Sequence, residues 1–123
     1  MKLENLTAIS PVDGRYRNKT SELSEYFSEF GLIKYRILVE IEYLLALNDL
    51  KLKGFPIISQ NQKKIFQEIY LNFNFVDAER IKEIEKTTNH DVKAVEYFVK
   101  ENLEKKGNSN VKEFVHFGLT SQD

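Results

Sequence analysis

The sequence has no cysteine and no tryptophan, and its 123 residues include only two prolines, five glycines and two histidines. A chain without cysteine has no disulfide, no thiolate metal site and no cysteine nucleophile. Eighteen basic residues nearly balance nineteen acidic ones, and the net charge of −1 gives no general attraction to nucleic acid or to an anionic membrane. We therefore expect neither nucleic acid nor a membrane as a partner.

Long apolar runs are missing as well. No window approaches the roughly 18 apolar residues of a membrane-spanning helix, and the segment from Met1 to Asn5 lacks the apolar stretch of a signal peptide. The absence of cysteine is compatible with a reducing compartment, and we expect a cytoplasmic protein. Glycine-rich phosphate loops and histidine pairs at metal-binding spacing are also missing, so we expect no metal and no cofactor.

The residues that are present have the composition of a folded globular protein, since 41% are hydrophobic and 30% are charged. Apolar residues recur at helical spacing, and no segment shows the strict alternation of a strand. The sequence therefore predicts an all-α fold of about five helices. We expect residues 1–123 to form a single helical domain in which residues 1–19 make an extended arm with a turn.

The helix predictions depend on apolar spacing and on capping residues. The strongest covers Leu32 to Leu50, where apolar residues leave little purely polar surface and predict a helix buried on several sides. Ser59 and Gln62 have the spacing of a capping box at the start of the next helix. The remaining predicted helices run from Thr20 or Ser21 to Phe30 with a break at Gly31, from a cap at Asp77 through Ile81 and Ile84, and from Val92 to Leu103 before Gly107.

The polar run Thr87-Thr88-Asn89-His90-Asp91 interrupts the helical pattern and predicts a junction between two helices. A helix that begins here would direct free backbone N–H groups toward a neighbouring anion. His90 would add a side chain able to form a hydrogen bond. The same residues also fit a simple helix cap with an exposed His90.

The segment HFGLTSQD, residues 116–123, contains a second set of possible anion-binding groups. Gly118 permits a tight backbone, and Thr120 and Ser121 provide hydroxyl and backbone donors that suit a carboxylate or a phosphate. An ordinary cap for a following helix, at Ser121 or Asp123, fits the pattern too.

A third candidate is Arg15, which follows the Ser-Pro-Val-Asp-Gly turn of residues 10–14. A turn fixed by its proline and glycine could hold the guanidinium in place, and its geometry matches a phosphate or a carboxylate. The alternative is a surface arginine beside a Tyr16 that packs on the first helix.

Together, the three segments resemble adenylosuccinate lyases, a family within the fumarase/aspartase superfamily. The resemblance lies in LTAISPVDGRY at residues 6–16, TTNHDVKAVEYF at 87–98 and HFGLTSQD at 116–123. Their order and approximate spacing match the branch that opens with the Ser-Pro-Val-Asp-Gly-Arg-Tyr motif, so the resemblance covers essentially the whole chain. The first two motifs are quite specific to the family, whereas the third is shared more loosely across the superfamily.

The resemblance implies an elimination reaction. Members of the family release fumarate from adenylosuccinate to give AMP, and they also cleave succinylated aminoimidazole carboxamide ribotide in purine biosynthesis. A base removes a proton from the succinyl Cβ, the carbanion is stabilised as its aci-carboxylate, and an acid protonates the departing nitrogen. Each substrate carries one phosphate and two carboxylates, so the site must hold three anionic groups and stabilise a further developing charge.

The resemblance also implies roles for residues of this chain. Arg15 and Tyr16 would bind the substrate through its phosphate. Asn89, His90 and Asp91 would line the nucleotide site, and His90 would position the substrate by hydrogen bonding.

Thr120 and Ser121 would hold a succinyl carboxylate, whereas His116 is expected to be structural. The family's catalytic acid, a histidine, and its catalytic base, a serine on a mobile loop, belong to segments that this sequence does not contain. We therefore expect no catalytic residue in these 123 residues and no lyase activity from the chain alone. The implied fold is the small helical N-terminal domain of a fumarase/aspartase-type lyase, without the central long-helix bundle of a longer, homotetrameric protein.

Other interpretations fit part of the sequence. An argininosuccinate lyase, a fumarase or a cycloisomerase would act on a substrate without a nucleotide phosphate, which the Arg15-Tyr16 and Asn89-His90-Asp91 segments disfavour. A stand-alone helical interaction module would keep the fold without catalysis. A helix-turn-helix DNA-binding protein is disfavoured by the net charge and by the lack of a basic recognition helix.

Overall fold

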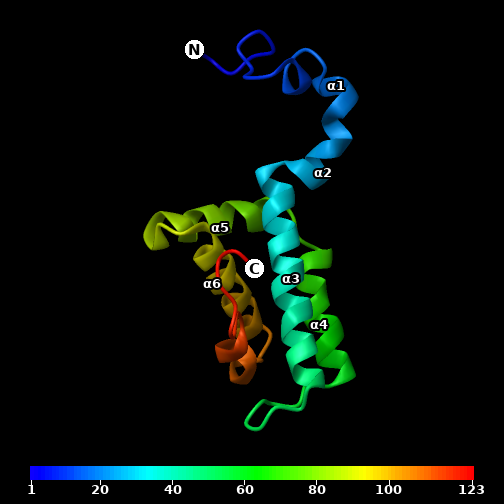
Figure 1. The fold of residues 1–123 in the computed structure, drawn as a ribbon, viewed down its shortest axis with the longest axis vertical. Helices are drawn as coiled ribbons and strands as arrows, with labels where there is room; N and C mark the ends of the chain where they lie inside the picture. Colours follow the sequence, from blue (N-terminus) through cyan, green and yellow to red (C-terminus); the bar gives the residue numbers. More distant parts are fainter. The chain divides into compact units, whose positions relative to one another are not determined.

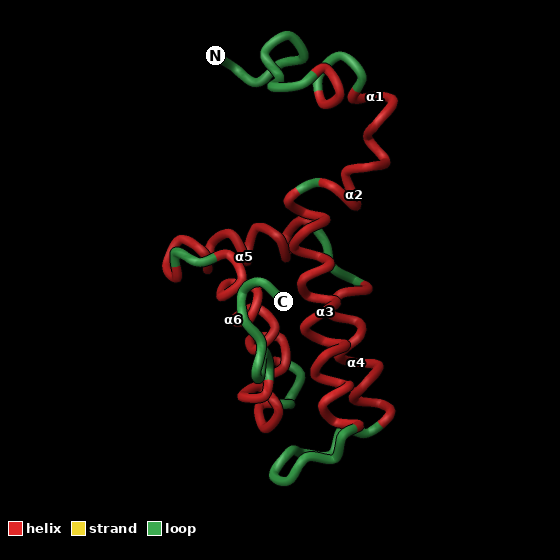
Figure 2. The backbone as a smooth tube through the Cα atoms, viewed as in Figure 1, coloured by secondary structure: helices red, strands yellow, loops and turns green.

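The computed structural model describes all residues from 1 to 123 and contains helices and loops but no strands (Figure 1, Figure 2). This confirms the all-α prediction. No helix combines the length and the apolar composition that crossing a membrane requires. The α-helices are α1 (Arg17–Thr20), α2 (Ser24–Phe27), α3 (Glu29–Asp49), α4 (Gln60–Leu71), α5 (Phe75–Thr88) and α6 (Asp91–Lys105), and the 3₁₀ turns are η1 (Pro11–Asp13), η2 (Ser21–Leu23) and η3 (Ser109–Phe114).

The chain divides into two compact units, Met1–Leu32 and Ile33–Asp123. The single domain that the sequence suggests for residues 1–123, with an arm over residues 1–19, stays a prediction.

The first unit consists of short helical turns. The helix predicted from Thr20 or Ser21 to Phe30 is wrong, because this stretch is split into η2, α2 and the start of α3. The break lies at Ser28, whose backbone is extended and whose hydroxyl accepts a hydrogen bond of 3.1 Å from Gly31 N, as a helix cap does. Gly31 therefore lies inside α3 and does not interrupt it. The predicted cap Thr20 instead donates its hydroxyl to Val12 O at 2.9 Å.

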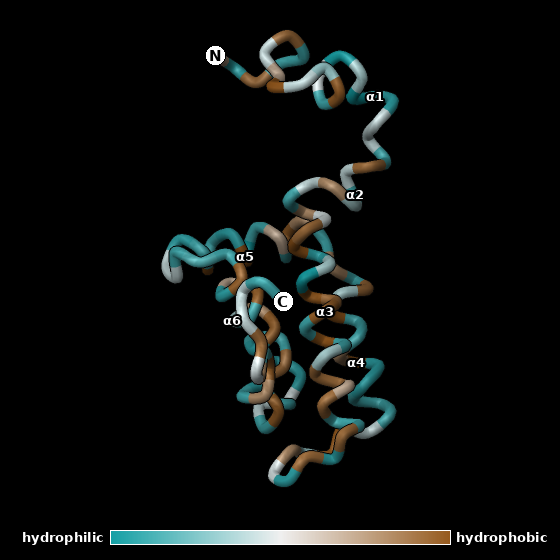
Figure 3. Tube along the Cα trace, viewed as in Figure 1, coloured by the Kyte–Doolittle hydropathy of each residue, from teal (hydrophilic) through white to brown (hydrophobic).

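The second unit buries the apolar faces of its helices in one core. Hydrophobic positions recur along α3, α4 and α6 between hydrophilic ones (Figure 3). This is the pattern of helices that bury one side and expose the other. The largest fully buried side chains are Ile37, Ile41 and Leu44 of α3, Phe66 of α4, Ile81 of α5, Val95, Val99 and Leu103 of α6, and Val111 of η3.

Polar contacts also join α3 to α4. Glu42 of α3 accepts hydrogen bonds from Tyr70 Oη at 2.7 Å and from Gln67 Nε2 at 3.0 Å. Burial and the neighbouring Glu42 carboxylate raise the pKa of Tyr70 to about 12, so the phenol remains protonated and donates.

The helix boundaries of the second unit follow local capping chemistry. The capping box of Ser59 and Gln62 at the start of α4 is confirmed, and the Gln62 amide also donates to Asn108 Oδ1 at 2.7 Å. The predicted cap at Asp77 is wrong, because Asn74 caps α5 and Asp77 closes the same box from three residues later. An asparagine before two apolar residues is as good a cap as an aspartate, and it lies nearer the preceding turn.

Phe66→Ala is expected to lower the free energy of unfolding by about 3–5 kcal/mol, because it empties a position that is 0% exposed in the core. Urea unfolding of the 123-residue chain, followed by circular dichroism, measures this. Phe75→Ala is the matched control, since Phe75 is 69% exposed and its loss should change stability by less than about 0.5 kcal/mol. Equal losses in the two variants would contradict this core.

Candidate functional site

The predicted junction between two helices is confirmed, with α5 ending at Thr88 and α6 beginning at Asp91. Asn89 closes α5 in the left-handed conformation, with φ 53° and ψ 29°. Asparagine is one of the few side chains that adopt this conformation readily. His90 is extended and is the N-cap of α6, and both side chains are on the protein surface.

Backbone donors at the start of α6 already have partners within the chain. His90 Nδ1 accepts from Lys93 N at 3.1 Å, and Asp91 Oδ1 accepts from Val92 N at 2.9 Å. The free N–H groups that the sequence suggested as an anion site are therefore largely capped by the motif itself. Since Nδ1 of His90 accepts, its ring proton is on Nε2. That N–H and the Asn89 amide remain for a ligand.

Asp91 also connects α6 to α3. Its Oδ2 accepts from Arg36 Nη1 at 2.8 Å, and this hydrogen bond is the main reason why the pKa of Asp91 lies below its ordinary value. The ion pair is partly open to water, with 53% of the Asp91 side chain and 28% of the Arg36 side chain exposed.

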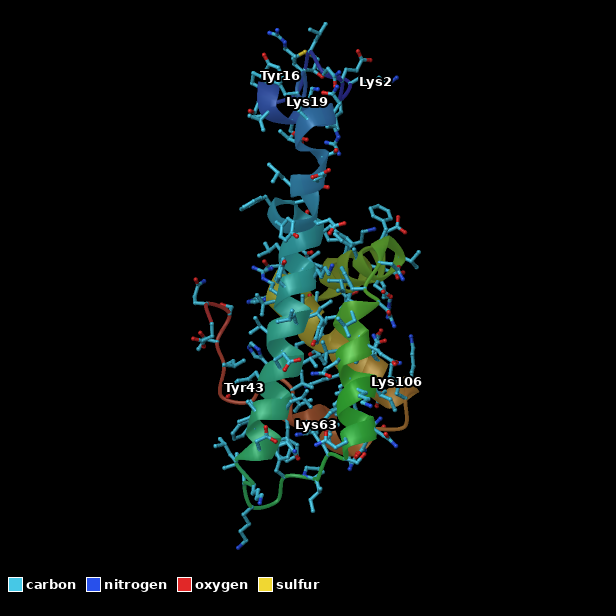
Figure 4. The ribbon with its side chains drawn as sticks, turned by 90° about the vertical axis from the view of Figure 1, so that its right-hand side faces the viewer. Lys2, Tyr16, Lys19, Tyr43, Lys63 and Lys106 are labelled. Atoms are coloured by element: carbon cyan, nitrogen blue, oxygen red, sulfur yellow. The ribbon has the colours of Figure 1, made fainter.

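The segment of residues 116–123 is attached to the same helix. His116 Nδ1 lies 2.5 Å from Oε1 of Glu40, and the Tyr43 hydroxyl donates to Phe117 O at 2.6 Å. Figure 4 shows Tyr43 on α3 beside this C-terminal segment. This contact is partly buried, and the structural role expected for His116 stays a prediction.

Thr120 binds a carboxylate within the chain. Its backbone N–H donates to Asp123 Oδ2 at 2.7 Å, and its hydroxyl donates to the same oxygen at 3.0 Å. These bonds lower the pKa of Asp123, the backbone bond being the stronger cause. Ser121 follows on the surface. The two Thr120 donors, which the sequence predicts to hold a substrate carboxylate, therefore both point to Oδ2 of Asp123.

Arg36, Glu40 and Tyr43 form what we call the polar stripe of α3. Their spacing of four and three residues places them on one face of the helix, within about 10 Å along its axis. Arg36 contacts Asp91, Glu40 contacts His116, and Tyr43 contacts Phe117. All three partners lie in the predicted site segments. The structure thus brings the Asn89–Asp91 junction and the segment of residues 116–123 to one helix face.

The sequence prediction does not include the polar stripe, because apolar residues dominate the segment from Leu32 to Leu50. Part of the outer face of α3 is exposed even at apolar and aromatic positions, including Tyr35 and Val39. The signal was present, since Arg36, Glu40 and Tyr43 recur at helical spacing within an otherwise apolar helix.

Arg15 and Tyr16 belong to the first unit, where a tight turn holds their backbone. Tyr16 N donates to Pro11 O at 2.9 Å, and the Arg15 guanidinium lies 5.0 Å from the centroid of the Tyr16 ring. Gly14 is required by close approach, because a Cβ there would lie 2.6 Å from Asn5 O. Both the arginine and the tyrosine side chains are exposed. The structure contains no cluster of three or more acidic or histidine side chains that could hold a metal ion.

Asp91→Asn is expected to lower the free energy of unfolding at neutral pH by about 0.2–1 kcal/mol, the range of exposed ion pairs. The folded-state pKa of Asp91 is depressed, so its stabilisation is complete above the unfolded value of about 3.9 and is lost as the pH falls through the folded value. Melting temperatures of both proteins across acidic and neutral pH measure this. A difference that persists at the lowest pH would contradict the assignment, and Asp91→Asn should have no added effect in an Arg36→Gln background.

Comparison with known proteins agrees with the resemblance seen in the motifs. A model of the family described as "Lyase" matches residues 14–123. The chain is 55% identical over 127 residues to the adenylosuccinate lyase of Dictyostelium discoideum, 52% identical over 125 residues to that of Vibrio cholerae and 47% identical over 125 residues to that of Escherichia coli.

These matches cover 100% of this chain but only 27% of each relative. The part matched is the N-terminal portion of the relatives. The family match extends over almost all of the chain, including the second and third motifs and the end of the first. The chain therefore belongs to the lyase family, and over its whole length it is similar to adenylosuccinate lyases.

Proposed function

We propose that this chain is the substrate-binding N-terminal part of an adenylosuccinate lyase. The full protein would eliminate fumarate from adenylosuccinate to give AMP, and from succinylated aminoimidazole carboxamide ribotide. In each case a proton leaves the succinyl Cβ, the bond from the adjacent carbon to nitrogen breaks, and the nitrogen takes up a proton as fumarate forms. The observation that carries the proposal is the similarity of the whole chain to relatives with that name.

The carboxylate contact at Thr120 supports a role in binding the succinyl group. One backbone N–H and one hydroxyl converge on a single carboxylate oxygen of Asp123. Bonds from neutral donors to an ionised acceptor are stronger than neutral pairs. A succinyl carboxylate in the place of Asp123 would receive the same two bonds, with Ser121 available beside it.

The Asn89–Asp91 junction supports a role in binding the nucleotide. The αL backbone of Asn89 and the capping contact of His90 fix the backbone of both residues at the surface. Their remaining donors, the Asn89 amide and the His90 Nε2 proton, are the groups we assign to the substrate. Asp91 would act by anchoring the junction to Arg36, in addition to any contact with the nucleotide.

Arg15 and Tyr16 are assigned to the phosphate. The neighbouring Arg17 is paired with Asp13 at 2.6 Å, whereas the exposed Arg15 guanidinium lies over the Tyr16 ring. Stacking on an aromatic face leaves the edge of a guanidinium free to form two parallel hydrogen bonds to a phosphate.

The proposal places the catalytic acid and base outside these 123 residues, in a homotetrameric cytoplasmic protein. Proton transfer by a positioned acid or base commonly contributes about 10²–10⁴-fold each. The chain alone is therefore proposed to bind substrate groups without turning the substrate over. A stand-alone interaction module is the competing function, and it predicts no activity in any combination.

The first test is fumarate release from adenylosuccinate by four samples. The chain alone should be inactive, because it lacks the acid and the base. A chimera in which this chain replaces the matching N-terminal portion of the Dictyostelium discoideum enzyme should be active. The C-terminal portion of that enzyme alone should be inactive and should gain activity when the chain is added. A folded chimera without activity would contradict the proposed function, and turnover by the chain alone would contradict the assignment of catalysis to other segments.

Asn89→Gly in the chimera separates binding from folding. Glycine adopts the αL conformation freely, so the melting temperature should stay close to that of the parent. Loss of a hydrogen bond to the charged substrate should lower kcat/KM about 10- to 100-fold.

Asn72→Gly is the matched control, because Asn72 is another exposed asparagine that ends a helix, α4. Its kcat/KM should remain within about twofold of the parent. Equal activities for the two variants would remove Asn89 from the binding site.

A further inference from the structure

The contact between Glu40 and His116 is a largely buried polar contact of the second unit, outside the assigned substrate groups. Only 6% of the Glu40 side chain and 17% of the His116 side chain are exposed. One carboxylate oxygen lies 2.5 Å from His116 Nδ1, and the other, Oε2, is buried without a hydrogen-bond partner. A buried carboxylate is unfavourable unless it is paired. The contact with His116 therefore offsets the cost of burying the Glu40 side chain.

His116 has an unusual backbone at this contact. Its φ of 64° is in the left-handed region, and Gly118, two residues later, has a φ of 74°. A glycine accommodates this conformation freely, whereas a histidine with a Cβ does so only when its surroundings hold it. Glu40 is the side chain that holds the His116 ring.

Tyr43 provides a second attachment one turn further along α3. Its hydroxyl donates to Phe117 O at 2.6 Å, and a Cβ at Gly118 would lie 3.6 Å from the same hydroxyl. The neighbouring residues His116 and Phe117 are thus bound by Glu40 and Tyr43, which are adjacent members of the polar stripe. Only Gly118 and Leu119 separate Phe117 from Thr120, so the two contacts restrict where the Thr120 donors lie.

We propose that Glu40 and Tyr43 are positioning residues for substrate binding, which hold the turn of residues 116–118 so that Thr120 and Ser121 present their donors to a succinyl carboxylate. This inference rests on the proposed function for its substrate. It assigns no contact with substrate to either residue. The effect passes through the backbone of residues 116–121.

The chain offers a matched control for Tyr43. Tyr70 also forms one phenol hydrogen bond within the second unit, but to Glu42, and it joins α3 to α4. Tyr43→Phe and Tyr70→Phe each remove one hydroxyl with little change of shape. Only the first variant releases the segment that carries Thr120.

The experiment uses the active chimera and measures KM and kcat for adenylosuccinate. Tyr43→Phe and Glu40→Ala should raise KM about tenfold, because small displacements of a binding group weaken substrate contacts strongly. Glu40→Gln should recover most of the parental KM, since its amide oxygen still accepts from His116. Tyr70→Phe should leave KM within about twofold. Equal KM values for Tyr43→Phe and Tyr70→Phe would overturn the proposal.

A second measurement does not depend on activity. Hydrogen exchange of the 123-residue chain reports the protection of backbone amides from residue 117 to 123. Tyr43→Phe should speed exchange in this segment, and Tyr70→Phe should not. Unchanged exchange in Tyr43→Phe would overturn the positioning role even if the parent chimera is inactive. An inactive parent chimera with faster exchange in Tyr43→Phe would instead contradict the proposed function and leave the contact of α3 with the segment supported.

Discussion

The buried carboxylate of Glu40 is the constraint that organises the second unit around its candidate site. α3 places apolar side chains such as Ile37, Ile41 and Leu44 in the core, and Glu40 lies among them at 5% exposed. A polar group at such a position needs a hydrogen-bond partner, and His116 is the partner that the chain provides. The contact joins to α3 a residue that lies 76 positions away in the sequence. Tyr43 and Arg36 then use the same helix face to fix Phe117 and Asp91.

Each of the two candidate site segments of the second unit forms hydrogen bonds within itself. His90 and Asp91 cap the start of α6, and Asp123 accepts from Thr120. Such local side-chain-to-backbone bonds favour one conformation of an exposed segment. At the proposed site, a substrate carboxylate would replace the internal Asp123 carboxylate, so the net gain from that contact would be smaller than its strength alone suggests.

The sequence predicted the elements whose signals are local. The capping box at Ser59, the glycine stop at Gly107 and the junction at residues 89 and 90 each depend on a few neighbouring side chains, and each is present. The prediction of one helix between Thr20 and Phe30 was wrong because it relied on apolar spacing alone. The Ser28 hydroxyl caps the start of a new helix within that stretch. Periodicity identifies a helical tendency, but a capping side chain decides where the helix starts.

The sequence by itself determined the helical class, the position of the three motifs and, through their resemblance, the family to which the chain belongs. It did so because capping and apolar period are properties of short stretches, and the order of the motifs can be read directly along the chain. Tertiary structure alone decided that Arg36, Glu40 and Tyr43 connect two of those motifs. Polar residues within an apolar helix do not specify their partners, because pairing across 55 to 76 residues depends on how the helices pack and on which buried charges must be compensated.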